Sequence, residues 1–192
     1  MFNAAGLRMS APMRASLLLL APAALILALV APAYAQAPKP APKPAAPAAT
    51  PGPKSIGSFD DWQAATYVEG GQTVCYAFTK ARNSTPAIPG RGEAILTVTQ
   101  RSTGRDAMAL TAGFEYAANA TAEIQVDAAK IEFYTAKRSA FARDGHAVVL
   151  ALFKAQKITA TSPHPQKNKV VDTFSPKGFA KAYEAINKVC PK

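Results

Sequence analysis

The feature that most constrains this chain is a pair of cysteines, Cys75 and Cys190, which are the only two in the sequence. Neither belongs to a C-x-x-C motif or has a histidine beside it, so neither resembles a catalytic or metal-binding thiol. In an oxidising compartment two such cysteines form a disulfide, and the connectivity is then unambiguous. Closing a loop of more than about 100 residues stabilises a fold by roughly 4 to 5 kcal/mol in the chain-entropy model. We therefore expect one domain that this bridge closes.

The N-terminal residues indicate an oxidising compartment. Two arginines precede an unbroken apolar run at 17–30, and a small-x-small cleavage motif follows and ends at Ala35. This pattern is typical of a secretory signal peptide, here residues 1–35, with cleavage between Ala35 and Gln36. The apolar run is shorter than the roughly 20 residues that a membrane-spanning helix needs. We expect no transmembrane segment after signal removal, and a periplasmic, outer-surface or secreted protein.

Residues 36–54 are almost entirely alanine, proline and lysine. Frequent proline fixes φ and removes backbone donors, so this segment is expected to be a disordered, extended linker that buries no core. The domain is predicted to span residues 55–192, which is long enough for one hydrophobic core. No period of about 20 to 50 residues repeats within it, which argues against solenoids and propellers.

Several segments of this domain are predicted to be β-strands. The clearest alternates apolar and polar residues at 121–127, as expected for a strand with one face on a core and the other in water. Short connections between such strands favour antiparallel pairing. A loop is predicted at 162–168, between the last two strands. The predicted strands are 93–100, 107–114, 121–127, 131–135, 157–161 and 169–174.

Two segments change to a helical period. Asp144 is predicted to cap a short helix whose apolar face includes Val148 and Leu152. Ser175 is predicted to be the N-cap of a C-terminal helix, with Pro176 at its first position. The pattern predicts a mainly β fold with α (α+β), namely an antiparallel β-sandwich or partly open barrel with a short middle helix and a C-terminal helix.

Charge and motifs exclude more functions than they indicate. The formal net charge is +10, but the basic residues are scattered and form no block of five or more. The sequence has no G-x-S-x-G, S-x-x-K or H-E-x-x-H motif and no cluster with zinc-ligand spacing. We therefore expect no catalytic residues, no metal site and no cofactor. Aromatic and basic residues alternate at 133–143, yet the inward register of Phe133 favours a core role, so no nucleic acid is expected as a partner.

Several single residues stand out by type or position. His146 is interpreted as a surface or boundary residue, and His164, between two prolines, as a loop residue. Asp60 and Asp61 are interpreted as a solvated turn, and Trp62 as a core anchor on the first strand. Three acidic residues fall on predicted outward faces. Their pattern fits ordinary strand-surface residues, and it equally fits a site in which two carboxylates act as a glycosidase pair. These are Glu115, Glu123 and Glu132.

An ordered set of landmarks resembles one protein family, the invasion-associated locus B family of alphaproteobacterial exported proteins. The resemblance covers essentially 55–190, and it implies a small β-rich envelope protein with two cysteines. Pathogenic members of the family are associated with entry into host cells. The resemblance implies no catalytic residues for this chain. The landmarks are Phe59-Asp-Asp-Trp62, Val74-Cys-Tyr-Ala-Phe78, Arg91-Gly92, Thr97-Val-Thr-Gln-Arg101, Asp172-Thr-Phe-Ser-Pro-Lys-Gly-Phe179 and Ala185-Ile-Asn-Lys-Val-Cys190.

Three functional hypotheses follow from the residues and the resemblance. The leading one is a non-enzymatic exported protein that binds an envelope or host-cell component. A second is a periplasmic hydrolase or enzyme accessory with an unrecognised site, around His164 and Asp172. A third is polyanion binding through the basic surface. The identity of the partner, the oligomeric state and the choice between periplasm and cell surface stay open at this stage.

Overall fold

The computed structural model describes residues 52–192, except for the side chains of Lys167 and Asn168. The predicted signal peptide, its cleavage site between Ala35 and Gln36, and most of the predicted linker lie outside the described residues. Within the described part, the first strand already begins at Lys54, the last residue assigned to the linker.

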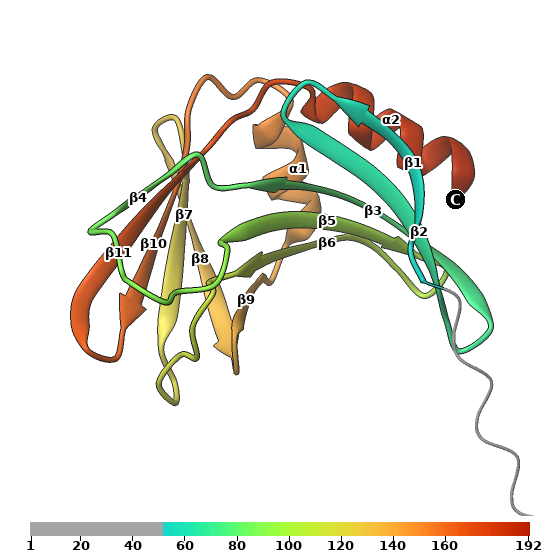
Figure 1. Cartoon of the computed structure of the whole chain (residues 1–192). Coiled ribbons are helices and arrows are strands. Elements are labelled where there is room, and N and C mark those ends of the chain that lie inside the picture. Colours follow the sequence, from blue (N-terminus) through green and yellow to red (C-terminus); the bar gives the residue numbers. More distant parts are fainter. Residues whose placement is uncertain (1–51) are drawn as a thin grey trace, which may run out of the picture. The chain divides into compact units, whose positions relative to one another are not determined.

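Eleven β-strands form one open sheet in which every paired neighbour is antiparallel (Figure 1). This confirms the mainly β, antiparallel prediction with a short middle helix and a C-terminal helix. The order across the sheet is β1-β2-β3-β5-β6-β9-β8-β7-β10-β11-β4. The strands are β1 (Lys54–Phe59), β2 (Trp62–Glu69), β3 (Gln72–Lys80), β4 (Asn83–Thr85), β5 (Ile95–Arg101), β6 (Gly104–Thr111), β7 (Thr121–Val126), β8 (Ala129–Ala136), β9 (Ser139–Ala142), β10 (Ile158–His164) and β11 (Lys167–Phe174).

The sheet is bent into two arms, and the chain crosses between them directly after β3. One arm contains β1, β2, β3, β5 and β6, and the other contains β7 to β11 and β4 (Figure 1). Only residues 81–82 separate β3 from β4, although these strands lie at very different places in the sheet order. In this crossing the Arg82 N–H donates to the Thr173 carbonyl at 2.8 Å, so the far edge of the sheet is tied back to its third strand.

The core lies on the inner side of the bend, where the apolar residues of the alternating strands point. Trp62 and Phe133 are among the largest fully buried side chains, from opposite arms. The inward faces predicted for β5, β6 and β7 are the buried ones, which confirms the reading of the period-two pattern. Their buried apolar residues include Leu96, Val98, Met108, Leu110, Ala122, Ile124 and Val126.

Helix α1 (Gly145–Leu152) covers part of this inner face and matches the sequence prediction. The Asp144 carboxylate accepts a hydrogen bond from the Ala147 N–H at 2.9 Å, as expected for an N-cap. Val148, Val149 and Leu152 are its buried residues, and the helix packs on β6.

Helix α2 (Phe179–Val189) packs across β1, β2 and β3, and it begins later than predicted. The N-cap is Gly178, whose φ is +90°, and not Ser175. A Cβ at Gly178 would lie 1.8 Å from the Phe59 carbonyl oxygen, so only glycine fits there. The prediction for Ser175 and Pro176 was wrong because the close approach of the left-handed Gly178 to Phe59 sets the start of the helix at Phe179.

The loop predicted at 162–168 is also shorter than expected. Strand β10 continues to His164, and β11 already begins at Lys167. The pairing register shifts between Ser162 and His164, so Pro163 lies at an irregularity of the ladder. A proline is tolerated at such a position because the ladder needs no donor there.

A disulfide joins Cys75 on β3 to Cys190, the residue that ends α2, with a Cα–Cα distance of 6.0 Å. Cys75 is fully buried. The pairing agrees with the sequence argument, and it fixes α2 on the arm that contains β1 to β3. At the other end of α2, Trp62 and Phe179 pack edge to face, with ring centroids 4.9 Å apart.

No helix among residues 52–192 is long and apolar enough to cross a membrane.

Candidate functional site

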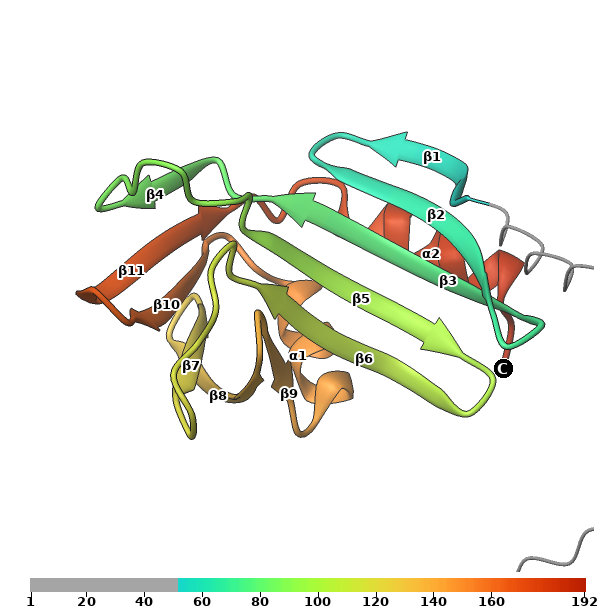
Figure 2. The ribbon, with the colours of Figure 1, turned by 60° about the horizontal axis from the view of Figure 1, so that its bottom comes forward.

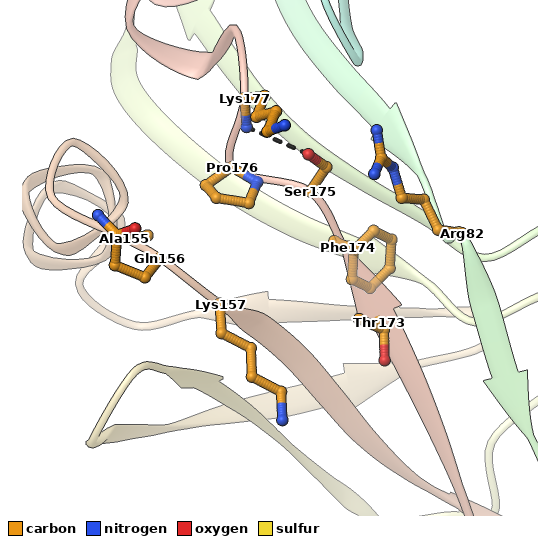
Figure 3. Close-up of a pocket in the computed structure, with 9 residues that line it drawn as sticks. All are labelled: Arg82, Ala155, Gln156, Lys157, Thr173, Phe174, Ser175, Pro176 and Lys177. Atoms are coloured by element: carbon orange, nitrogen blue, oxygen red, sulfur yellow. Dashed lines mark hydrogen bonds between the residues drawn. The ribbon is translucent and has the colours of Figure 1, made fainter.

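A pocket of about 440 Å³ lies where the crossing after β3, the connection from α1 to β10, and the end of β11 meet. We call it the basic pocket, because its charged lining residues are Arg82, Lys157 and Lys177 (Figure 3). Figure 3 shows Lys157 on one side of the pocket and Arg82 on the other, with Phe174 and Ser175 between them. The remaining lining residues are Ala155, Gln156, Thr173 and Pro176.

The wall that carries Lys157 is held by a carboxylate from a β-hairpin. Asp127 has a φ of +52° in the turn between β7 and β8. Its side chain accepts backbone hydrogen bonds from Gln156 at 3.0 Å and from Lys157 at 2.8 Å. These bonds fix the backbone of the α1–β10 connection, so Lys157 leaves it from a defined position.

The opposite wall is held through Ser175. The Ser175 hydroxyl donates to Asp61 Oδ2 at 2.6 Å, and the Ser175 carbonyl accepts from Trp62 Nε1 at 2.9 Å. The same hydroxyl oxygen accepts from the Lys177 N–H at 3.2 Å, in a turn that precedes the start of α2 at Phe179. The bond from Ser175 also shows that Asp61, interpreted as part of a solvated turn, is instead a connecting residue, whereas Asp60 is exposed.

The electrostatics of the basic pocket favour an anion. Asp61 forms an ion pair with Arg82, and the pKa of its carboxyl lies below the usual range, first because of the hydrogen bond from Arg82 and then because of that from Ser175. Within residues 52–192, neither Lys157 nor Lys177 takes part in an ion pair. Three cations therefore stand against two nearby carboxylates, those of Asp61 and Asp127.

A second polar cluster surrounds Asp172, which the sequence had grouped with His164 as an alternative hydrolase site. Both oxygens of Asp172 accept from Arg91, from Nη1 and Nη2 at 2.7 Å each, and Ser84 adds a bond of 2.6 Å. His164 packs its ring against Phe114, with centroids 4.6 Å apart. No hydrogen bond joins His164 to Asp172 among the described residues, so the structure does not assemble them as an acid–base pair.

A third cluster centres on Asp106, which the sequence reasoning missed. Asp106 Oδ1 accepts from Gln100 Nε2 at 2.6 Å and from Tyr183 Oη at 2.7 Å, while Oδ2 lies 2.8 Å from His146 Nδ1. The ring of His146 is largely exposed, at 63%, as expected for a boundary residue. A Cβ at Gly145 would lie 1.8 Å from the Asp106 carbonyl oxygen, so glycine allows the start of α1 to approach β6.

Two opposing effects act on the Asp106 carboxyl. Burial raises its pKa, but the hydrogen bonds from Gln100, Tyr183 and His146 outweigh burial and leave the pKa below the ordinary 3.8. Tyr183 responds in the opposite direction, because burial and its bond to Asp106 raise its pKa. A signal for this cluster was present in the sequence. Asp106 is two residues before Met108 and four before Leu110, so the alternation of a strand places its acidic side chain on the same inward face.

The remaining singled-out residues do not converge on a site. Trp62 is fully buried but lies on β2 rather than on the first strand. Glu123 and Glu132 face each other directly across β7 and β8, and Lys130 lies 3.3 Å from Glu123, whereas Glu115 is exposed outside the strands. Among residues 52–192 no group of three or more His, Cys, Asp or Glu side chains is placed to hold a metal ion.

Comparisons with known proteins give one consistent result. A sequence model described as "Invasion associated locus B (IalB) protein" matches residues 62–187. The fold is similar to the crystal structure of invasion associated protein B from Bartonella henselae, with a TM-score of 0.51 and 18% sequence identity, over 70% of this chain and 95% of that one. No curated protein sequence matches this chain at a significant level.

Proposed function

This chain belongs to the invasion-associated locus B family, and from that premise we propose that it is an exported binding protein whose basic pocket takes an anionic group of an envelope or host-cell component. Binding is proposed in place of catalysis, and the shared chemistry of the ligand is a phosphate or carboxylate. A lipid head group and a soluble anion can both supply it.

The observation that carries this proposal is that three cationic residues from three distant segments line one pocket. Arg82, Lys157 and Lys177 come from separate connections, and hydrogen bonds fix the backbone of each wall, exposed ones at Asp127 and a half-buried one at Ser175. A fixed backbone lowers the conformational entropy that is lost when an anion binds. None of the lining residues is a histidine, cysteine or carboxylate, which favours binding over acid–base or nucleophilic chemistry at this place.

Export is part of the proposal and rests on separate support. The pattern at 1–35 predicts a secretory signal peptide, and the Cys75–Cys190 disulfide is of the kind that persists in oxidising compartments. The proposed location is therefore the periplasm or the cell surface. Entry into host cells is a property of some family members, and for this chain it is one of the roles that anion binding would serve.

The experiment compares two double variants of equal net charge. Lys157→Gln with Lys177→Gln removes the free cations of the basic pocket. The control, Lys130→Gln with Lys188→Gln, removes two exposed lysines that pair with Glu123 and Glu184 elsewhere. Binding is measured with vesicles of phosphatidylglycerol and phosphatidylcholine, with phosphatidylcholine vesicles alone, and with soluble glycerol phosphate.

The pocket variant is expected to bind anionic vesicles or glycerol phosphate about 10- to 30-fold more weakly than the unchanged protein, because each cation near an anionic surface contributes about 1 kcal/mol. The control variant should stay within about twofold of the unchanged protein. Binding to vesicles alone would identify a lipid head group, and binding to glycerol phosphate as well would identify the isolated anion. Equal losses in both variants, or no binding to either anionic probe, would overturn the proposal.

A further inference from the structure

The outer face of the sheet, on the side away from both helices, contains a second pocket, of about 430 Å³. Figure 2 is turned toward this face, with β2, β3, β5 and β6 in front and α1 and α2 behind them. The pocket, which we call the outer-face pocket, has no lining residue in common with the basic pocket. It is lined by Tyr67, Tyr76, Phe78, Ile95, Thr97, Thr99 and Thr111.

Aromatic rings form one side of the outer-face pocket. Tyr76 and Phe78 are two residues apart on β3, so both point to the outer face, and their rings stack with centroids 5.8 Å apart and planes at 26°. Tyr67 on β2 meets the edge of Tyr76, with centroids 5.6 Å apart. All three side chains are half-buried. They form a cluster of aromatic rings, inclined to one another, on a sheet face that neither helix covers.

Hydroxyl groups form the other side. Strand register places Thr97 beside Phe78 and Thr99 beside Tyr76, and Thr111 lies across from Ile95. Throughout residues 52–192, no side-chain hydrogen bond engages Thr97, Thr99 or Thr111. The hydroxyls of the half-buried Thr97 and Thr111 are therefore available to a ligand that lies against the rings, while Thr99, 9% exposed, lies deeper.

The lack of charged lining residues distinguishes this pocket from the rest of the surface. The chain has a formal net charge of +10, yet no charged residue lines the outer-face pocket. At its rim, Lys80 pairs with Glu93 at 2.8 Å and Arg101 pairs with Glu69 at 2.6 Å. Each rim charge is thus balanced by its neighbour. The pocket complements an uncharged partner, and it offers no surplus charge to an anion or a cation.

We propose that the outer-face pocket binds a neutral sugar chain. A sugar ring has a face of C–H bonds with partial positive charge, which suits the negative face of an aromatic ring such as Tyr76 or Phe78. Its hydroxyls at the ring edge can donate to and accept from Thr97 and Thr111. An apolar peptide would match the rings but would desolvate these hydroxyls without giving them partners, which costs free energy.

The experiment measures binding of neutral hexasaccharides of glucose, one α-linked and two with different β-linkages, to the full chain by calorimetry. Tyr76→Ala is expected to weaken binding about tenfold through the loss of a stacking surface. Thr97→Val keeps the shape of the side chain and removes its hydroxyl, and it should weaken binding several-fold. Phe78→Tyr keeps the ring and should bind like the unchanged protein. Tyr134→Ala, an exposed aromatic on β8 outside the pocket, is the matched control.

Two results would overturn the proposal. One is the absence of binding to every hexasaccharide, and the other is an equal loss of binding in Tyr134→Ala and Tyr76→Ala. Dimerisation of the chain that Tyr76→Ala abolishes, without any sugar binding, would assign the face to a second copy instead. Sugar binding should also be unaffected by high salt, because no unpaired charge lines this pocket. This salt response separates it from the anion binding proposed for the basic pocket.

Discussion

Two arginine–aspartate pairs lie beside each other near the end of β11 and differ in their access to water. In the pair of Arg91 and Asp172 the side chains are 5% and 0% exposed, whereas in the pair of Arg82 and Asp61 they are 56% and 27% exposed. The two pairs are connected, because the backbone of Arg82 binds Thr173, the residue after Asp172. The same two functional groups thus occupy one region of the fold in two very different dielectric environments.

This difference in solvent exposure shows how one fold can use an arginine–aspartate pair for structure in one place and for binding in another. Asp172 has three donors, and Arg91 also donates from Nε to the Ala112 carbonyl at 2.7 Å, so this buried pair has nothing left to offer a ligand. Arg82 is largely exposed and lines a pocket. We expect the buried pair to matter for stability and the exposed pair to matter for binding.

The largest expected effect comes from Asp172→Ala. It leaves the Arg91 guanidinium buried without a counter-charge, and the free energy of unfolding should fall by about 3–5 kcal/mol. Urea denaturation followed by circular dichroism measures this. Replacing both residues, with Arg91→Met and Asp172→Leu, should recover a large part of the loss, because no buried charge is then left alone. A loss below about 1 kcal/mol in Asp172→Ala would contradict the assignment of this pair to structure.

Asp106→Asn tests a carboxylate between these extremes, buried itself but bonded to an exposed histidine. The amide keeps one accepting oxygen, which Gln100 and Tyr183 share, but it loses the negative charge and the oxygen that faces His146, so the free energy of unfolding at neutral pH should fall by about 1–3 kcal/mol. Because the folded-state pKa of Asp106 is lowered, its ionisation stabilises the fold above the ordinary pKa of 3.8, and this contribution is lost as the pH falls through the folded-state pKa.

The pH dependence separates the two effects of Asp106→Asn. Thermal unfolding from pH 7 down to pH 2 should show a smaller drop for the variant than for the unchanged protein, so that their stabilities approach each other in acid. Asp60→Asn, at an exposed turn position whose φ of +49° suits asparagine, serves as the control and should follow the unchanged protein. Parallel curves for Asp106→Asn and the unchanged protein would refute the lowered pKa.

Arg91→Lys should have a smaller effect than the loss of Asp172. Lysine keeps the positive charge but cannot form the two parallel bonds to Asp172 or the bond to the Ala112 carbonyl. We expect a loss of about 1–2 kcal/mol in the free energy of unfolding, measured by the same urea titration. If lysine were as good as arginine here, charge alone would explain the pair, and the forked geometry would be irrelevant.

Arg82→Ala should have the smallest effect on stability, because water screens its pair with Asp61. The urea midpoint should stay within the scatter of the unchanged protein, while binding of anionic vesicles should weaken severalfold. A destabilisation as large as that of Arg91→Lys would remove the distinction between the two pairs.

The sequence predicted the elements with a regular pattern well because such periodicity reports burial directly. Strands β5, β6 and β7 alternate cleanly, and α1 has both a cap and an apolar face. Strands β1, β3, β4 and β9 were missed, and β2 was predicted only as the strand of Trp62, without bounds. In β4 and β9 three or four residues are too few to establish a period, and in β3 the adjacent buried Val74 and Cys75 interrupt the alternation. Pro163 was interpreted as a loop residue, because a sequence cannot show that it falls at an irregularity of the ladder.

The sites were harder to predict than the fold because their members are far apart in the chain. Arg82, Lys157 and Lys177 carry no common local pattern, and only the crossing after β3 brings the first of them to the other two. Ser175 was misassigned for the same reason, since its local capping signal forms only a turn with the Lys177 N–H, while the contact of Gly178 with the distant Phe59 sets the start of the helix. Asp106 could have been found, because a charged residue in an inward register is visible in the sequence.

The disulfide also depends on the order in which the chain is made. Cys190 follows every strand and both helices in the sequence, so Cys75 cannot acquire its native partner until all of them have been synthesised. A chain cut short anywhere before Cys190 would leave the Cys75 thiol unpaired, and in an oxidising compartment such a thiol is open to capture as a mixed disulfide. The bridge therefore distinguishes finished molecules from truncated ones by a single chemical group.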